Sequence, residues 1–242
     1  MNKPQTAKLT SYEQREMIVV ACDLELSHED LSLGFVVQLG LSAFDTDTQE
    51  EVCCGSWFMY QPFKKTWHTR TWNEFWMNEK LGKPVLDWYM SPECVKVHAA
   101  VAVREFLDMF AGLRALDKPL LFIGDALTAD MPWLKMLLEL FTDREGSDPR
   151  SPFRLVAPER FTNPLQFPDY LRGRAKIPID DRRTNYWTAA ERCVGLEKWV
   201  VPQFISRAGG PHDALYDARI MTHRFGRLFP HFSKKAEDRD SE

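Results

Sequence analysis

The alternation of apolar and polar positions divides the chain into strand-like runs followed by helical segments. Residues 17–26 (MIVVACDLEL), 34–44 (GFVVQLGLSAF) and 51–60 (EVCCGSWFMY) are apolar runs of strand length, and three such runs in succession predict a meander. Residues 118–124 (KPLLFIG) predict a short buried strand before a helix. Strands that alternate with helices after an initial meander indicate an α/β fold, with a mixed β-sheet flanked by α-helices.

Three segments carry apolar residues at the three- and four-residue spacing of an amphipathic helix. Residues 91–113 begin with a Ser/Glu pair that resembles a capping start, and their stripe consists of Val95, Ala99, Ala102, Phe106 and Phe110. In residues 130–141 the stripe consists of Leu134, Leu137, Leu138 and Phe141. In residues 214–228 it consists of Ala214, Leu215, Ala218, Met221, Phe225 and Leu228. We expect each stripe to face the core.

Composition narrows the class of protein. A chain of 242 residues with 44% hydrophobic content can bury a substantial core, and we expect one domain over residues 17–232 between a flexible N-terminus (1–16) and a disordered charged tail (233–242). No apolar run approaches a membrane span and the start of the chain is polar, so we expect a cytoplasmic protein with no membrane partner. The five cysteines form no CxxC or Cys/His metal spacing. The net charge of −4 gives no global sign of nucleic-acid binding.

Carboxylates follow two of the predicted strands. Asp23 and Glu25 lie two residues apart at the end of the first strand, so their side chains point to the same face. Such a pair suits a hard divalent cation, although charged residues also commonly follow buried strands. Asp130 follows the fourth strand and opens a helix with Pro132 just inside, a pattern that is equally typical of a helix N-cap.

A histidine and an aspartate stand at the start of the last helix. His212 follows two glycines and Pro211, and Asp217 comes five residues later. Five helical residues separate two side chains by roughly 140°, so the two would not share a face if both were helical. If His212 lies in the approach loop, it can swing over the helix toward Asp217. The alternative is a surface histidine near a helix start and an aspartate on a solvated face.

Taken together, these segments resemble the DEDDh branch, with its RNase T-like enzymes, of the DEDD family of 3′-to-5′ exonucleases. The first family motif, Asp-x-Glu, is matched by Asp23 and Glu25 in CDLE, and the second, an Asp after a later strand, by Asp130 in FIGDALTAD. The third, His-x-Ala-x-x-Asp, is matched by His212 and Asp217 in HDALYD. The resemblance covers residues 17–228. Residues 71–93, with their tryptophans, and 177–187 (IPIDDRRTNYW) are looser matches to RNase T-like exonucleases.

The resemblance implies an RNase H-like fold and hydrolysis of phosphodiester bonds at single-stranded DNA or RNA 3′ ends, with release of nucleoside 5′-monophosphates. It implies two divalent metal ions, Mg²⁺ or Mn²⁺, held by the family carboxylates, here Asp23, Glu25, Asp130 and Asp217. His212 is then the general base. We expect a neighbouring carboxylate such as Asp213 to keep its pKa near or above about 6.5. Many relatives are dimers, which leaves a homodimer open.

Further residues are candidates for contact with substrate. Trp72 and Trp76 are four residues apart and, in a helix, would share a face that offers a ring to a terminal base; the alternative is that both are core residues. Lys64, Lys65 and Arg182 are candidate phosphate contacts or ordinary solvated side chains. Two other functions remain open: a non-catalytic nucleic-acid- or metal-binding accessory module on the same fold, and a glycosidase that uses Asp23 and Glu25 as acid and base and needs no metal.

Overall fold

The protein folds around one mixed β-sheet. The computed structural model describes residues 16–124, 127–141 and 210–230, and shorter pieces at 150, 152, 161–162, 188, 191–192, 194–197 and 199–206. The strands are β1 (Ile18–Leu26), β2 (Val36–Asp45), β3 (Glu50–Met59), β4 (Lys96–Val97), β5 (Leu120–Ile123) and β6 (Phe161–Thr162). The helices are α1 (Thr69–Thr71), the π-helix η2 (Trp72–Trp76), α2 (Lys83–Met90), α3 (Ala99–Arg114), α4 (Leu127–Phe141), α8 (Gln203–Ser206) and α9 (Ala214–Leu228).

The strand order is β4-β3-β2-β1-β5-β6. β1, β2 and β3 pair antiparallel as a meander, whereas β5 pairs parallel with β1 and β6 parallel with β5. A parallel neighbour requires a crossover, and α3 supplies most of it between the meander and β5. The mixed sheet and the meander that the sequence predicts are therefore confirmed.

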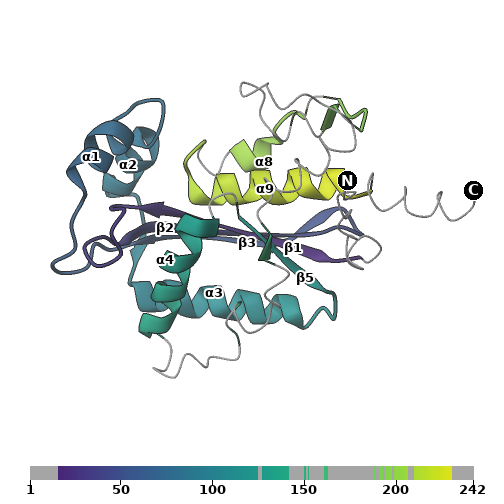
Figure 1. Ribbon diagram of the computed structural model, residues 1–242, viewed down its shortest axis with the longest axis horizontal. Helices are drawn as coiled ribbons and strands as arrows, with labels where there is room; N and C mark the ends of the chain where they lie inside the picture. The colour runs from purple at the N-terminus through teal and green to yellow at the C-terminus, as the bar shows by residue number, and fades with distance from the viewer. Residues whose placement is uncertain are drawn as a thin grey trace, which may run out of the picture.

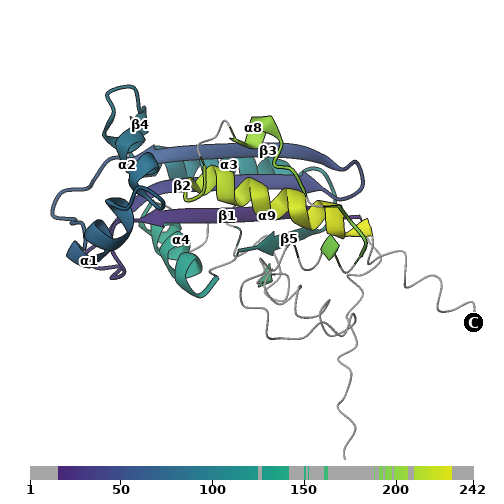
Figure 2. The same cartoon turned by 90° about the horizontal axis from the view of Figure 1, so that it is seen from above.

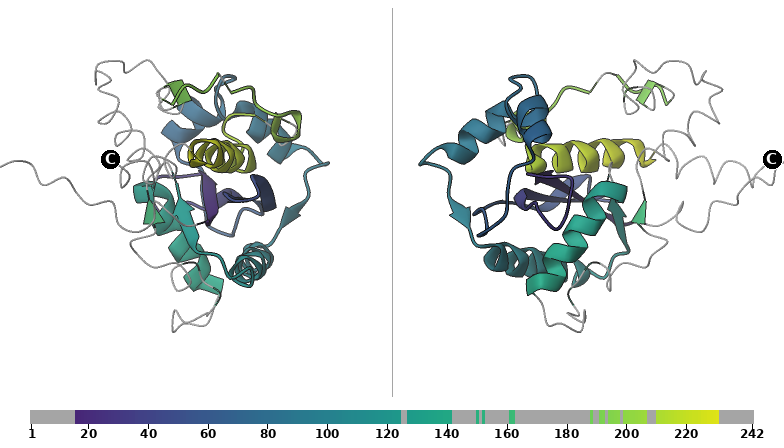
Figure 3. Two further views of the ribbon diagram at one scale, coloured as in Figure 1. Left: turned by 90° about the vertical axis from the view of Figure 1, so that its right-hand side faces the viewer. Right: turned by 60° about the vertical axis from the view of Figure 1, so that its left-hand side comes forward.

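Helices cover both faces of the sheet (Figures 1 and 2). Ile18, Val20 and the other even-numbered residues of β1 pack on α3 and α4, and Val19 and Ala21 pack on α9. End-on views place α9 on one side of the sheet and α3 and α4 on the other (Figure 3). Because side chains alternate along a strand, the odd-numbered Asp23 and Glu25 continue the row that faces α9.

Two of the predicted helix starts are wrong. The expected helix over 91–113 begins only at Ala99, because residues 96–97 pair as β4 and Val95 is 82% exposed. The expected helix over 130–141 begins earlier, at Leu127, so Asp130 lies in its first turn and is not its N-cap. The other predicted stripe positions of α4 are buried, but Phe141 is 47% exposed.

The described residues also bear on the expectations about membrane spans, cysteines and the ends of the chain. No helix in the described parts of the chain is both long and apolar enough to cross a membrane. The four described cysteines, Cys22, Cys53, Cys54 and Cys94, are free thiols. The ends expected to be flexible, 1–16 and 233–242, lie outside the described residues apart from Glu16.

Candidate active site

The carboxylates of the first motif lie where β1 runs past its parallel neighbour. The last β1–β5 pair is Ala21 with Ile123, so Asp23 and Glu25 extend beyond the end of β5. Ligands in open sheets with parallel strands bind at such carboxyl ends, where loops and helix starts leave the sheet. This end of β1 is the natural position for a site.

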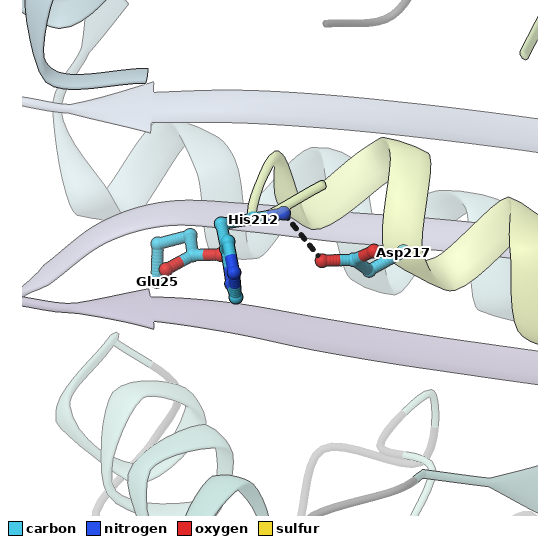
Figure 4. Close-up of side chains that lie close together, drawn as sticks. All are labelled: Glu25, His212 and Asp217. Atoms are coloured by element: carbon cyan, nitrogen blue, oxygen red, sulfur yellow. Dashed lines mark hydrogen bonds between the residues drawn. The ribbon is translucent and has the colours of Figure 1, made fainter. Parts of the chain in front are cut away.

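Three of the predicted residues form a cluster there. Each of Glu25, His212 and Asp217 offers a ligand atom, and these atoms all lie within 4.8 Å of one another. Glu25 is buried at 7% exposure, and the other two side chains are half-buried. Figure 4 shows them converging from β1 and from the start of α9. Two carboxylates and an imidazole at this spacing can hold a hard cation or exchange a proton with a bound molecule.

The backbone of His212 explains how it reaches Asp217. His212 precedes the first residue of α9 by two positions and has a φ of 69°, in the left-handed region that non-glycine residues rarely adopt. The turn directs its backbone N–H to Oδ2 of Asp217 at 2.8 Å (Figure 4). The edge-to-face ring of Phe75 lies 5.2 Å from the imidazole, at an interplanar angle of 88°. His212 therefore lies over the helix start, as expected for a loop residue, and is held there by contacts on two sides.

Asp213 has a different task from the one we expected. Its Oδ1 accepts hydrogen bonds from the backbone N–H groups of Leu215 and Tyr216, both at 3.1 Å, so it is the N-cap of α9. Its Oδ2 accepts one from Nε2 of the fully buried Gln38 at 3.0 Å. Burial raises the pKa of Asp213, although these hydrogen bonds oppose the rise.

The expectation that Asp213 holds the pKa of His212 near or above its ordinary value is wrong. Burial lowers the pKa of its imidazole below the ordinary value, because desolvation disfavours the charged ring. The carboxylate of Asp213 is committed to the helix cap and to Gln38. Burial therefore favours the neutral imidazole, which is the state that a general base requires.

The start of α9 lies directly against the backbone of β2. A Cβ added to Gly40 would lie 2.2 Å from the carbonyl carbon of Ala214, so no larger residue fits without movement of the helix. Gly40 is the β2 partner of Asp23, and Gln38 is the partner of Glu25. Gln38 also accepts a hydrogen bond from the Ala214 N–H at 3.1 Å. The pair on β2 therefore sets the height of the helix start above the two carboxylates.

Asp23 and Asp130 lie outside the 4.8 Å cluster but act on a common neighbour. Burial raises the pKa of the Cys22 thiol well above its ordinary value, and the negative charges of Asp130 and Asp23 raise it further. Asp130 is itself buried, at 5% exposure, in the first turn of α4. The charges of Asp130, from the second motif, and of Asp23, from the first, therefore both act on Cys22 in β1.

The two tryptophans that we expected to contact substrate differ in their burial. Trp76 is fully buried and its Nε1 donates to the carbonyl of Leu26 at 3.1 Å, so the expectation that its ring stacks on a base is wrong. Trp72 is half-buried and packs edge-on against Trp67.

The basic candidates differ as well. Nζ of Lys65 donates to the carbonyls of Leu31 and Ser32, at 3.3 and 2.7 Å, and thereby ties down the loop after β1. Lys64 is exposed, with its ammonium 5.5 Å from the ring of Phe63. Arg182 lies outside the described residues.

Three residues that support the site were not predicted. Gln38 is a polar residue inside an otherwise apolar run, and Gly40 is a glycine inside the same strand, which signals a close approach of another backbone. These two signals could have identified them. Phe75 carries no such signal, because its contact with His212 depends on the π-helix.

Comparison with known proteins identifies the fold. No protein-family model and no curated protein sequence matches the chain. The nuclease domain of 3′hExo, a DEDDh family member solved with rAMP bound, is 12% identical with a TM-score of 0.53, over 91% of this chain and 94% of that chain. Cell-death related nuclease 4 (CRN-4) is 11% identical with a TM-score of 0.55, over 90% of this chain and 65% of that chain.

Exonuclease I of Methylocaldum szegediense is 11% identical with a TM-score of 0.52, over 90% of this chain and 42% of that chain. The chain therefore spans less than two thirds of the length of CRN-4 and of this exonuclease I. At these identities the likeness concerns the fold, and the fold of this chain is that of the DEDDh 3′-5′ exonucleases.

Proposed function

We propose that the protein is a metal-dependent 3′-to-5′ exonuclease that releases nucleoside 5′-monophosphates from single-stranded DNA or RNA. The observation that carries the proposal is the convergence of Glu25, His212 and Asp217 within 4.8 Å at the end of β1. The fold adds support, since similar structures include a DEDDh nuclease domain bound to rAMP and a 3′-exonuclease that recognises the 3′ end of the histone mRNA stem-loop.

The donor set suits hard divalent cations. Carboxylate oxygens are the preferred ligands of Mg²⁺ and Mn²⁺, and an oxygen of Glu25 and one of Asp217 lie within 4.8 Å of each other. In this proposal Asp23 and Asp130 complete the set of four carboxylates, and two cations bind. When bound, such a pair neutralises charge on the phosphate and lowers the pKa of water.

Side chains of the protein would accept the proton of the attacking water and hold the accepting group in place. In this proposal His212 accepts the proton of the attacking water at an imidazole nitrogen, since burial favours its neutral ring. Asp217 would have two tasks, because the carboxylate that would hold a cation also accepts the backbone N–H of His212. Phe75 limits the rotation of the imidazole by its edge-on contact.

The test is a degradation assay with matched DNA and RNA oligonucleotides that carry a 5′ label. With Mn²⁺ we expect a ladder that shortens from the 3′ end, together with free nucleoside 5′-monophosphates, and no ladder in EDTA. Glu25→Gln should abolish the ladder, whereas Glu93→Gln, a matched change at an exposed position, should not. An enzyme that binds 3′ ends but releases nothing in any cation would contradict the proposal and favour the accessory module.

A further inference from the structure

A pocket of about 690 Å³ opens beside the candidate active site, on the α9 side of the sheet. Its floor includes Phe58 of β3, one wall comes from α2 with Trp88, and another comes from the segment before α9 with Pro211 and Asp213. Figures 1 and 3 show α2 near the N-terminal end of α9, on the same side of the sheet. The volume lies in the range of small-molecule sites.

The pocket and the site share one turn of the chain. The N–H of Asp213 donates to the carbonyl of Gly210 at 3.0 Å, which closes the turn 210–213. Within it, His212 joins the cluster with Glu25 and Asp217, while its sequence neighbours Pro211 and Asp213 line the pocket. A molecule in the pocket would therefore contact both sequence neighbours of the proposed general base.

The walls suit a flat ring with polar edges. Trp88 is 46% exposed, so part of its ring is accessible to a ligand, and Phe58 and Leu81 add apolar surface. Ser56 and Glu79 offer hydrogen-bonding groups to the edge of a ring, and the exposed Lys80 offers a cation to a phosphate. A base stacks on aromatic side chains regardless of its sequence identity. An aromatic wall with a few polar groups beside it is thus the chemistry of a nucleobase site.

We propose that this pocket binds a base of the single-stranded substrate on the 5′ side of the cleaved bond. The inference rests on the proposed function, because an exonuclease that removes one nucleotide at a time keeps the rest of its strand on that side. The turn 210–213 contributes residues to both the cluster and the pocket, so a strand that passes over this turn would contact both. Trp88 then contributes to affinity for the strand and takes no part in the chemistry.

The test is a binding cycle with 5′-fluorescein oligothymidylates in Ca²⁺, with a phosphorothioate at the 3′-terminal linkage to slow hydrolysis. Trp88→Ala should weaken binding of the unmodified strand about tenfold, the scale of one stacked base. Removing single bases along the strand should weaken binding to the wild type by a similar factor at one position 5′ of the terminal bond. At that position, Trp88→Ala and removal of the base together should weaken binding no more than either change alone.

Controls separate the pocket from the general surface. Met90→Ala changes another exposed residue of α2 (55%) that does not line the pocket, and it should leave affinity unchanged. Trp88→Phe should retain most of the affinity because it keeps a ring. Thermal melting of Trp88→Ala should match the wild type, so that a loss of affinity is not a loss of fold.

The inference is overturned if Trp88→Ala binds normally, if base removal and Trp88→Ala act independently at every position, or if the coupled base is the terminal one. These outcomes are separable from the fate of the proposed function, which is judged by Mn²⁺-dependent release of mononucleotides. Coupling without release would show that the pocket binds a base of a strand that the protein does not cleave, and would refute the exonuclease. Release without coupling would uphold the exonuclease and refute the assignment of a base to the pocket.

Discussion

The close approach of α9 to β2 makes Gly40→Ala the most informative single substitution. The added methyl would lie 2.2 Å from the carbonyl carbon of Ala214, 2.3 Å from its oxygen and 2.5 Å from the nitrogen of Leu215. Carbon atoms in contact prefer a separation of about 3.5–4.0 Å. All three obstacles are backbone atoms of the helix start, so the helix itself must withdraw by about 1 Å.

The cost follows from what that movement breaks. Gln38 is fully buried and bonds Asp213 and Ala214 at 3.0 and 3.1 Å; a buried amide left without these partners costs about 1–3 kcal/mol. Overpacking adds about 1–3 kcal/mol. We expect the free energy of unfolding to fall by about 3 kcal/mol. We also expect kcat to fall about 100-fold, because a 1 Å displacement of a catalytic group has an effect of that order.

Urea unfolding and the mononucleotide-release assay measure the two effects. Gly112→Ala is the matched control, since Gly112 lies in the last turn of α3 and a Cβ there meets nothing within 4 Å; it should stabilise the protein by up to about 0.5–1 kcal/mol and leave kcat unchanged. Wild-type stability and kcat in Gly40→Ala would refute the reasoning that β2 sets the position of the helix start.

Four further outcomes are expected. EDTA should abolish hydrolysis and Mg²⁺ or Mn²⁺ should restore it, whereas Ca²⁺, with its laxer geometry, should support binding with little turnover; full activity in chelator would contradict the metal mechanism. His212→Ala should lower kcat by about 10²-fold or more with oligonucleotide affinity retained, and a near-normal kcat would make this histidine a bystander. Burial raises the pKa of Glu51, but His223 and Arg219 outweigh it, and the net pKa is lowered. The resulting stabilisation is present above the unfolded pKa of about 4.3 and is lost as the pH falls through the lower folded value. Arg219→Met should therefore destabilise the protein by about 2 kcal/mol at pH 7 and by less at pH 3, as urea unfolding at the two pH values will measure; an equal loss at both would be inconsistent with this ion pair. Trp76→Leu should cost about 3 kcal/mol of stability with an unchanged KM, because the ring lies in the core. A raised KM at wild-type stability would instead indicate that the ring contacts the substrate.

The parts of the fold that the sequence predicts are those governed by a single periodicity. The continuous apolar runs are typical of strands buried on both faces, and the meander follows from their spacing. Alternation along β1 is enough to direct Asp23 and Glu25 to one face. The predicted stripe of α9 is likewise buried at Ala218, Met221, Phe225 and Leu228.

The errors occur where tertiary contacts override the local pattern. The stripe of α3 extends in sequence back to Val95, but residues 96–97 form a short parallel pair with β3, and the helix cannot start before that pair ends. Helical spacing also suggests that Trp72 and Trp76 share one exposed face. The segment is a π-helix instead, and the hydrogen bond from Trp76 to the end of β1 pulls that ring into the core. Neither contact has a signature within a window of a few residues.

The left-handed φ of His212 was the least predictable feature of the site, and it has three supports. Asp217 accepts its N–H, Phe75 packs on its ring, and Gln38 holds the adjacent cap residue Asp213. A strained backbone persists only where its surroundings over-determine it, and here the surroundings come from three separate elements, α9, η2 and β2. A substitution at Phe75 should therefore change the geometry of the proposed base while every carboxylate remains in place. Residues of this kind can carry much of the activity without matching any motif.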